Sequence, residues 1–385
     1  MSLTLSSRHG CVLQSEIRNM SIECNRIGGI NLSQGVCDTP IPPVVVQGAS
    51  ESIEKGINTY THYAGLIQLR EAIAAKQKKY SGMECDPEQE IIVSAGATGA
   101  LYCSFQALLD PGDEVIVFEP YYGYHISTLQ AAEAVPVYVS LALPGWTFGI
   151  EELERVVTPK TRGIILNTPA NPSGKVFSPS ELTLIADFAE RHDLFVFTDE
   201  IYEHFIYSGH EHLSFATLPG MKKRTITVSG ASKTFSVTGW RIGYAICDAR
   251  WAKTIGYFND LVYVCAPAPL QAGVARGMRE LGEDYYLGLA REYEMKRDRF
   301  CQALSRAGLH PYIPDGAYYV FADVSSVPGS TGKERAMHIL HKTGVASVPG
   351  SAFYQDGKGE DIVRFCFAKE DAILDEACSR LQLLG

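Results

Sequence analysis

The chain has 385 residues, of which 46% are hydrophobic and 20% charged, and its formal net charge is −10. This is the composition of a soluble globular protein long enough for one large and one small domain. The negative charge and the short lysine and arginine runs argue against nucleic-acid binding. Since no apolar run reaches the roughly 18 residues of a membrane helix, we predict neither membrane insertion nor secretion.

The ten cysteines are spread along the chain and form no Cys-x-x-Cys pair. A chain of this length does not need disulfides to hold its fold. We therefore expect most of the cysteines to be buried and reduced, in a cytoplasmic protein without a metal site.

The first part of the chain offers two segments of interest. Residues 1–30 have little periodicity and are predicted to form an arm. In segment 31–43, Gly35 is followed by several prolines, which indicates a bend in an extended path. Tyr60 begins segment 60–70, which runs into a helical pattern. From the residues alone, Gly35 belongs to a plain loop and Tyr60 to the core or the surface.

Segment 90–108 reads as a strand, a turn of small residues and a helix. The turn contains Gly96, Ala97 and Thr98. Unpaired N–H groups and the helix dipole favour an anion at such a helix start, so this segment is a candidate phosphate loop.

The next apolar strand, residues 114–118, is followed by a group of tyrosines. Tyr122, or alternatively Tyr121, can stack on a flat ring or pack beneath a loop. Pro136 in the short strand 134–139 indicates a sheet edge or a strand start.

Two further buried strands, 162–167 and 194–198, end in polar residues. The first is followed by a loop restricted by two prolines, which can point the Asn171 amide into a cleft or form a simple turn. The second ends in Asp199, with Tyr202 shortly after it. Ligands of open α/β sheets bind beyond the carboxyl ends of strands, which favours a site role for Asp199 over a helix cap.

Segment 229–244 combines Lys233 with hydroxyl groups, glycines and Arg241. A lysine among small residues at a strand end can be desolvated, which exposes a nucleophilic amine. An arginine fork suits a phosphate group. An amine that captures an aldehyde and an arginine that binds a phosphate together point to pyridoxal phosphate. The residues alone leave open a surface lysine on a Gly/Ser loop.

The C-terminal part contains a long helical pattern over 281–307 and strands over 316–323 and 361–368. Arg364 interrupts the last strand, and a buried arginine needs an anion; an exposed strand face is the alternative. The pattern predicts an α/β fold: a three-layer α/β/α large domain with a mainly parallel seven-stranded sheet, and a smaller α+β domain. We expect residues 1–45 to form the arm and part of the small domain, 46–278 the large domain and 279–385 the rest of the small domain.

From about residue 31 to residue 368, these motifs in this order resemble the class I and II (fold-type I) aminotransferases, which use pyridoxal phosphate. Within that family, the sequence resembles the aspartate, aromatic and kynurenine aminotransferases. The resemblance implies that Lys233 holds the cofactor as an internal aldimine and moves the substrate proton, while Asp199 pairs with the ring nitrogen. It implies further contacts to the cofactor from Gly96, Ala97, Thr98, Tyr122, Asn171, Tyr202, Ser232, Arg241 and, across a subunit interface, Tyr60.

The resemblance also implies that Gly35, Asn171 and Arg364 bind the substrate carboxylate. The expected reaction is ping-pong transfer of an amino group from an L-amino acid to a 2-oxo acid by a homodimer. Two alternatives remain: another fold-type I enzyme, such as a carbon–sulfur lyase or a decarboxylase, and a cofactor-binding regulator without turnover. The sequence does not identify the amino donor or the acceptor.

Overall fold

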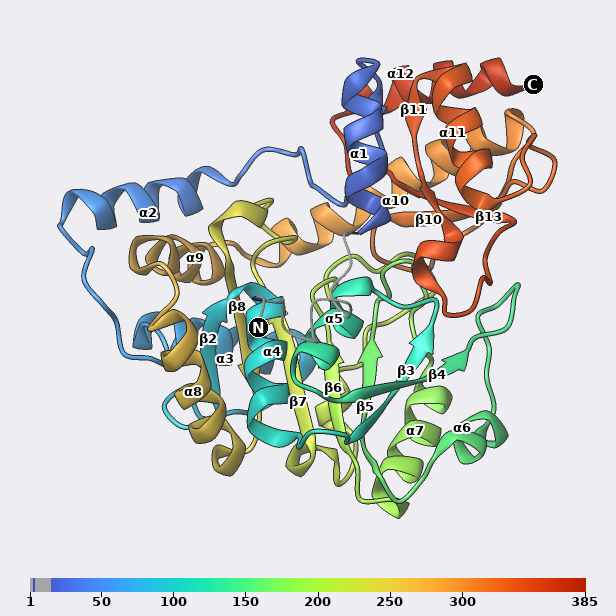
Figure 1. Cartoon of the computed structure of the whole chain (residues 1–385). Coiled ribbons are helices and arrows are strands. Elements are labelled where there is room, and N and C mark those ends of the chain that lie inside the picture. Colours follow the sequence, from blue (N-terminus) through green and yellow to red (C-terminus); the bar gives the residue numbers. More distant parts are fainter. Residues whose placement is uncertain (1–2, 4–14) are drawn as a thin grey trace.

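A mainly parallel sheet lies at the centre of the larger part of the molecule (Figure 1). The structure is a computed structural model that describes residue 3 and residues 15–385. The strand β8 runs antiparallel to both of its neighbours, and the remaining pairs are parallel. The strands are, in sheet order, β2 (Ile91–Ala95), β8 (Ile242–Ile246), β7 (Thr225–Gly230), β6 (Phe195–Asp199), β5 (Thr161–Asn167), β3 (Glu114–Glu119) and β4 (Val135–Ser140).

Helices cover both faces of this sheet because its strands are apolar on both sides. Along β5, Ile165 packs into the core on one face, whereas Ile164 and Leu166 pack into the core on the other. One layer contains α4 (Gly96–Leu108), α5 (Gly123–Ala131) and α8 (Ala249–Tyr263). The other layer contains α3 (Ile67–Ser81), α6 (Ile150–Val156), α7 (Pro179–Arg191) and α9 (Ala268–Glu280), with α2 (Pro43–Glu54) packed on α9. The predicted three-layer fold is confirmed.

A second, antiparallel sheet lies in the C-terminal part of the chain. Most of its buried residues pack in a core that also includes Tyr202 and Phe205, whereas Phe321, Val348 and Ile362 pack in a core shared with the large sheet. Its strands are, in order, β12 (Val348–Pro349), β13 (Ile362–Cys366), β10 (Tyr319–Asp323) and β9 (His310–Tyr312). The helices of this part are α10 (Glu283–Arg306), α11 (Gly332–Thr343) and α12 (Asp371–Leu381). The helix α10 is the predicted long helix, and Figure 1 shows it leading from the large sheet to the smaller one.

The N-terminal segment differs from the arm that its weak periodicity predicts. Residues 16–26 form the helix α1 (Glu16–Arg26), whose first turn is capped by the Ser15 side chain. Only Met20 and Cys24 are buried on it, and most of its other residues are polar. The strand β1 (Ile30–Asn31) then pairs in parallel with β11 (Val345–Ala346), which ties this segment to the C-terminal part. Residues 1–2 and 4–14 of the predicted arm lie outside the described residues.

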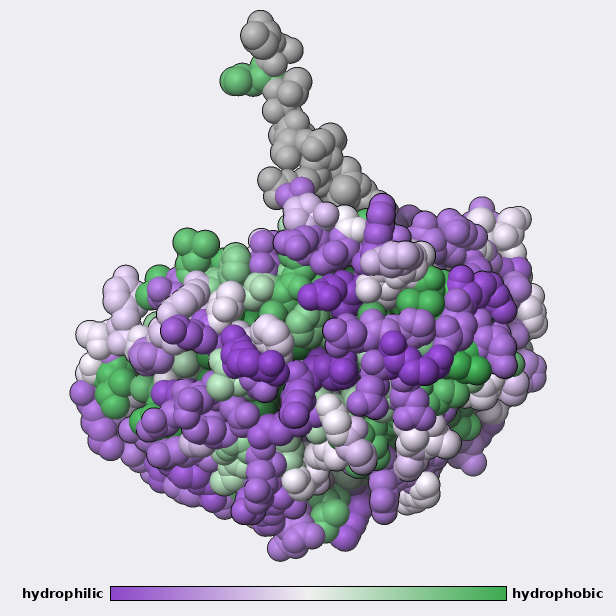
Figure 2. Space-filling model, turned by 90° about the horizontal axis from the view of Figure 1, so that it is seen from below, coloured by the Kyte–Doolittle hydropathy of each residue, from purple (hydrophilic) through white to green (hydrophobic). Residues whose placement is uncertain are grey.

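Short 3-10 helices complete the chain at η2 (Phe215–Thr217), η3 (Met221–Lys223), η4 (Thr238–Trp240), η5 (Gly350–Phe353) and η6 (Gln382–Leu384). Within the described residues, no helix is both long and apolar enough to cross a bilayer. The face drawn in Figure 2 is mainly hydrophilic, with hydrophobic residues in scattered groups. The nine described cysteines are free, and six of them are buried.

Candidate active site

The polar ends of neighbouring strands meet at one edge of the large sheet. Asn167 ends β5 and Asp199 ends β6, and the Asn167 amide donates to the Asp199 carbonyl at 2.8 Å. Lys233 follows β7 closely. Because the carboxyl ends of parallel strands lie side by side, residues far apart in sequence come together here. This is the edge that the strand pattern predicted.

Lys233 is half-buried at this edge, and its amine lies between aromatic rings. The amine donates to the Gly35 carbonyl at 3.1 Å and lies 5.9 Å and 5.8 Å from the ring centres of Tyr202 and Tyr318. Burial lowers the pKa of Lys233 below its ordinary value of 10.5. A larger share of neutral, nucleophilic amine is therefore present near neutral pH than for a solvated lysine.

Gly35 has no room for a side chain. A Cβ atom there would lie 1.9 Å from the Tyr319 hydroxyl oxygen, which itself contacts the Tyr202 hydroxyl at 2.9 Å. Glycine therefore lets segment 33–37 pass directly over the tyrosine pair. Tyr319 is a site residue that the sequence reasoning missed, because nothing near it in the chain marks it out.

Asp199 is buried and uses both carboxylate oxygens. Its Oδ2 contacts Nε2 of His125 at 2.9 Å, and its Oδ1 accepts from the Ile201 N–H at 3.2 Å. A turn, not a helix, follows Asp199, so the helix-cap alternative is wrong; Oδ1 instead stabilises this turn after β6. His125, in the first turn of α5, was missed by the sequence reasoning. Its position one helical turn after Tyr122 is the signal that points it to the same site.

The two candidate tyrosines after β3 point in different directions. The Tyr122 ring meets the His125 ring edge-on at 5.3 Å, next to Asp199. The Tyr121 ring packs against Tyr138 instead, and its hydroxyl donates to the Tyr354 carbonyl at 3.0 Å. Burial raises the pKa of Tyr122, so its hydroxyl stays protonated. Tyr122 is therefore the aromatic residue beside the carboxylate.

Arg364 lies in β13 and is almost completely buried, with 1% of its surface exposed. Its guanidinium donates to the Asn171 side-chain oxygen at 2.8 Å and to the Ser33 carbonyl at 2.5 Å, while Nε has no partner among the described residues. The Tyr319 and Phe353 rings lie 4.4 Å and 4.8 Å from the guanidinium carbon. The exposed-strand alternative is wrong. A buried cation without a carboxylate partner is suited to binding an anion.

The small-residue turn and Arg241 also meet. The helix α4 begins at Gly96 without a side-chain cap, and Ala97 and Thr98 are partly exposed beside it. The Arg241 guanidinium donates to the Ala95 carbonyl at 3.3 Å, and a Cβ at position 96 would lie 2.3 Å from its Nη2. Arg241 itself has a left-handed backbone, with φ of 56°. An uncapped helix start and an arginine together form an anion cradle.

Two predicted residues make no contact that defines a role in this cluster. Ser232 is buried next to Lys233, and its side chain has no hydrogen bond within the described part of the chain. Tyr60 is 82% exposed in the loop between α2 and α3. A single chain therefore leaves Tyr60 in solvent.

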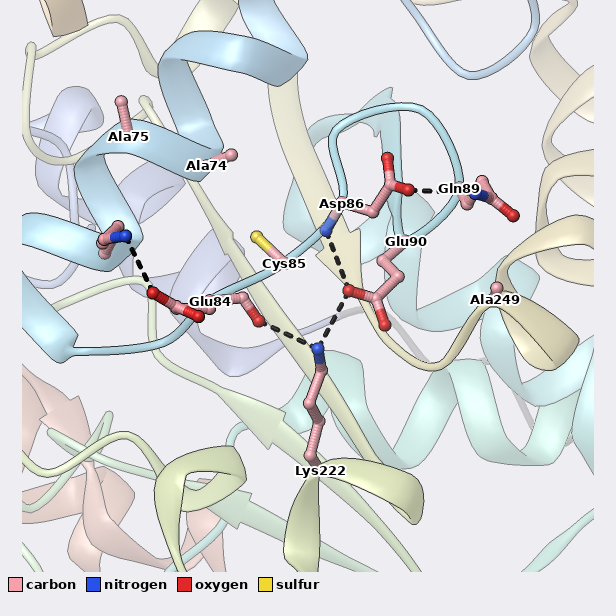
Figure 3. Close-up of a pocket in the computed structure, with 10 residues that line it drawn as sticks. Ala74, Ala75, Glu84, Cys85, Asp86, Gln89, Glu90, Lys222 and Ala249 are labelled. Atoms are coloured by element: carbon pink, nitrogen blue, oxygen red, sulfur yellow. Dashed lines mark hydrogen bonds and ion pairs between the residues drawn. The ribbon is translucent and has the colours of Figure 1, made fainter.

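A surface pocket of about 600 Å³ lies at the opposite edge of the sheet, near the start of β2 and α8 (Figure 3). The polar groups in its wall pair with one another. Lys222 donates to the Glu84 carbonyl at 2.9 Å and to the Glu90 carboxylate at 3.0 Å, and Lys78 pairs with Glu84 at 2.8 Å. The polar groups of this wall are thus engaged without a ligand.

Comparisons with known proteins agree with this geometry. The sequence pattern of the family "Aminotransferase class I and II" matches residues 27–381. Kynurenine–oxoglutarate transaminase 3 of Mus musculus is 38% identical over 379 residues, which cover 90% of this chain and 83% of the mouse protein. The structure of N-succinyldiaminopimelate aminotransferase from Mycobacterium tuberculosis has a TM-score of 0.96 and 35% identity, over 99% of this chain and 100% of that one.

Aspartate aminotransferase from Thermus thermophilus, solved with maleate, has a TM-score of 0.92 and 31% identity over 100% of both chains. The matches cover nearly the whole chain. Sequence similarity, fold similarity and the arrangement of the strand ends all indicate the same family. The chain belongs to the class I and II aminotransferases, a family of pyridoxal-phosphate-dependent enzymes that transfer amino groups.

Proposed function

We propose that Lys233 carries the cofactor and catalyses amino-group transfer between an L-amino acid and a 2-oxo acid. The observation that carries the proposal is the half-buried amine of Lys233, whose pKa burial lowers, at the same sheet edge as the Asp199–His125 pair. An amine in this state can attack an aldehyde. The carboxylate and the amine stand at the ends of adjacent parallel strands, β6 and β7.

The residues present fit pyridoxal phosphate at the phosphate end. The uncapped start of α4 offers backbone N–H groups, and Arg241 adds a fixed positive charge beside Gly96. We propose that Gly96, Ala97, Thr98 and Arg241 bind the phosphate. Ser232 is proposed to add its hydroxyl.

The residues also fit the ring of the cofactor. We propose that the Asp199 carboxylate, oriented by His125, faces the ring nitrogen and keeps it protonated. Tyr122 would stack on the ring, and Tyr202 and Asn171 would hydrogen-bond its oxygen. When bound, pyridoxal phosphate supplies an electron sink for the electrons of the substrate Cα–H bond.

The Arg364 guanidinium is proposed to bind the substrate α-carboxylate. Its Nε lacks a partner among the described residues, and Asn171 and the Ser33 carbonyl hold the rest of the guanidinium in place. Gly35 would pass over the bound carboxylate as backbone only. This fixes the Cα–H bond near Lys233, whose amine takes up and returns the proton as a general base, a role that contributes about 10²–10⁴-fold in rate.

We further propose a homodimer with active sites at its interface. Tyr60 is exposed in the single chain, and so are large apolar residues on and after α8, with Leu261 at 79% and Val262 at 46% exposed. A partner subunit that covers these residues would bring its Tyr60 to the phosphate end of the site. Light scattering should give twice the chain mass for the active protein, and a fully active monomer would exclude this arrangement.

The organisation and location of the chain are also proposals. We propose an N-terminal arm with part of the small domain (1–45), a large domain (46–278) and the rest of the small domain (279–385). The core that contains Met20 and Cys24 of α1 is built mainly from residues of 15–45 and 279–385, which supports this division. A cytoplasmic location is supported by the free thiols of the nine described cysteines.

The test begins with protein loaded with pyridoxal phosphate. Borohydride treatment followed by peptide mass spectrometry should find the cofactor attached to Lys233. A panel of L-amino acids crossed with 2-oxoglutarate and pyruvate should then yield new amino acids and identify the substrates. The relatives are named for different substrates, kynurenine, succinyldiaminopimelate and aspartate, so the panel should include amino donors of each kind. Attachment at another lysine, or turnover without amino transfer, would refute the proposal.

A further inference from the structure

Behind the site lies a buried polar cluster that the roles above do not use. Glu203 is at its centre, in the turn 200–205 that follows β6. The Lys76 amine lies 2.6 Å from Glu203 Oε1, and both side chains are at most 3% exposed. The contacts around this pair are Gln77 Nε2 to Glu203 Oε2 at 3.2 Å, Ser229 Oγ to Glu203 Oε1 at 2.6 Å, and Lys76 Nζ to the Tyr244 hydroxyl at 3.2 Å.

Glu203 lies in the turn that carries two of the proposed site residues. Asp199 ends the strand before this turn, and Tyr202 immediately precedes Glu203. The first residue of the turn is fixed as well: the Glu200 N–H donates to the Val228 carbonyl at 2.8 Å, and the Glu200 carboxylate accepts from Ser214 and the Phe215 N–H. The two glutamates of the turn thus anchor it to the interior of the molecule.

Ser229 connects the same carboxylate to the strand that leads to Lys233. It lies in β7, next to Tyr244 of β8 in the sheet register. The Glu203 carboxylate therefore links the turn after β6, to which Glu203 belongs, to the end of β7. Through Lys76 and Gln77 it also links this turn to the helix α3. Parts of the chain that carry Tyr202 and Lys233 share this one anchor.

Stability alone does not explain an ion pair buried this deeply. Burial would raise the pKa of Glu203, but the Lys76 charge and the hydrogen bonds around it lower that pKa to about 2. The pair is therefore ionised, and ionised buried pairs can often be replaced by well-packed apolar side chains without loss of stability. An apolar pair, however, cannot form a directional hydrogen bond between the turn and Ser229.

We propose that Glu203, held by Lys76 and bonded to Ser229, is a positioning residue for amino transfer. It fixes the turn that carries Tyr202 relative to the strand end that carries Lys233. The proposal rests on the function proposed above. It assigns Glu203 no contact with substrate or cofactor.

Two double variants with the same loss of charge test this role. Lys76→Met with Glu203→Met removes the link to Ser229, whereas Lys76→Met with Glu203→Gln keeps an oxygen that Ser229 can reach. We expect the first to lower kcat about tenfold, since small displacements of reacting groups cost this much or more, and to leave KM within about threefold. The second should stay within about threefold of the parent in kcat.

Hydrogen–deuterium exchange of the cofactor-free protein supplies a readout independent of activity. In the Met/Met variant, amides of residues 200–205 and 228–233 should exchange at least about fivefold faster than in the parent and the Met/Gln variant. Lys78→Met with Glu84→Gln is the matched control, because it removes an exposed ion pair that also starts in α3. The control should exchange and turn over as the parent does.

Equal exchange and equal kcat in the Met/Met variant and the parent would overturn the proposal, and so would equal losses in both double variants. If the Met/Met variant does not fold, Ser229→Ala breaks the same link with the ion pair intact. Unchanged exchange in Ser229→Ala would then overturn the proposal. A parent that does not transaminate would refute the proposed function instead. The exchange comparison would still decide whether Glu203 positions the turn.

Discussion

The two edges of the large sheet differ in how their polar groups are satisfied. At the edge where β5, β6 and β7 end, Arg364 Nε has no partner among residue 3 and residues 15–385, and within the same residues the one hydrogen bond of the Lys233 amine is to a backbone carbonyl. At the opposite edge, Lys222 and Lys78 pair with the glutamates around a pocket of about 600 Å³. The edge that contains the pocket is therefore the one whose lysines and glutamates already have partners. Chemistry is better located by polar groups that lack partners than by open volume.

The largest expected effect comes from Lys233→Ala. In the proposed mechanism this amine attaches the cofactor and takes up the substrate proton, so its loss should lower kcat by at least about 10³-fold. Steady-state transamination of the variant loaded with pyridoxal phosphate measures this. Lys222→Ala at the opposite edge is the control and should keep parental turnover. Near-normal transamination by Lys233→Ala would show that the chemistry does not depend on the edge that contains Lys233.

Arg364→Lys should follow in size. A lysine amine replaces the planar fork and loses the directed contacts to Asn171 and Ser33, so kcat/KM for amino donors should fall about 10–100-fold. Most of the loss should appear in KM. Arg162→Lys, an exposed arginine of β5, serves as the control. An unchanged KM would place the substrate carboxylate elsewhere.

His125→Asn should have a smaller effect. The asparagine cannot hold Asp199 Oδ2 as the imidazole does, and a hydrogen bond to a charged group is worth about 1.5–3 kcal/mol. We expect kcat to fall by about tenfold and the affinity for pyridoxal phosphate to weaken, measured by titrating cofactor-free protein. Parental values for both would mean that the pair does not orient the carboxylate.

The two edges should also differ in lysine titration. Burial lowers the pKa of Lys233 below 10.5, whereas the hydrogen bond and charge of Glu84 raise that of Lys78 above 10.5. As pH rises, Lys233 should therefore lose its proton first. Acetylation of cofactor-free protein across a pH series, read by mass spectrometry, gives both midpoints. A midpoint for Lys233 at or above that of Lys78 would contradict this order.

The smallest effect is expected at the pocket itself. Lys222→Met with Glu90→Gln removes a partly exposed ion pair, which typically contributes about 0–1 kcal/mol to stability. Thermal unfolding should shift by a few degrees at most and kcat should not change. A marked loss of transamination would show that the opposite edge acts on the site.

Sequence patterns predicted the residues that stand directly after buried strands, but not the partners they meet. Asp199 and Lys233 follow apolar runs, so strand order and the carboxyl-end rule were enough to bring them together. His125 and Tyr319 come from a helix start and from the second sheet, and only packing over long sequence separations brings them to Asp199 and Tyr202. The helix α1 was missed for a related reason, since its burial depends on β11 and β12 far along the chain.

The missing side chain at position 35 sets a limit on redesign of this enzyme. Even a methyl group there would collide with the Tyr319 hydroxyl oxygen, 1.9 Å from the ideal Cβ position. Tyr319 would have to leave both Tyr202 and the Arg364 guanidinium. A side chain at position 35 would therefore disturb Tyr202 and Arg364 together, although it touches neither of them directly.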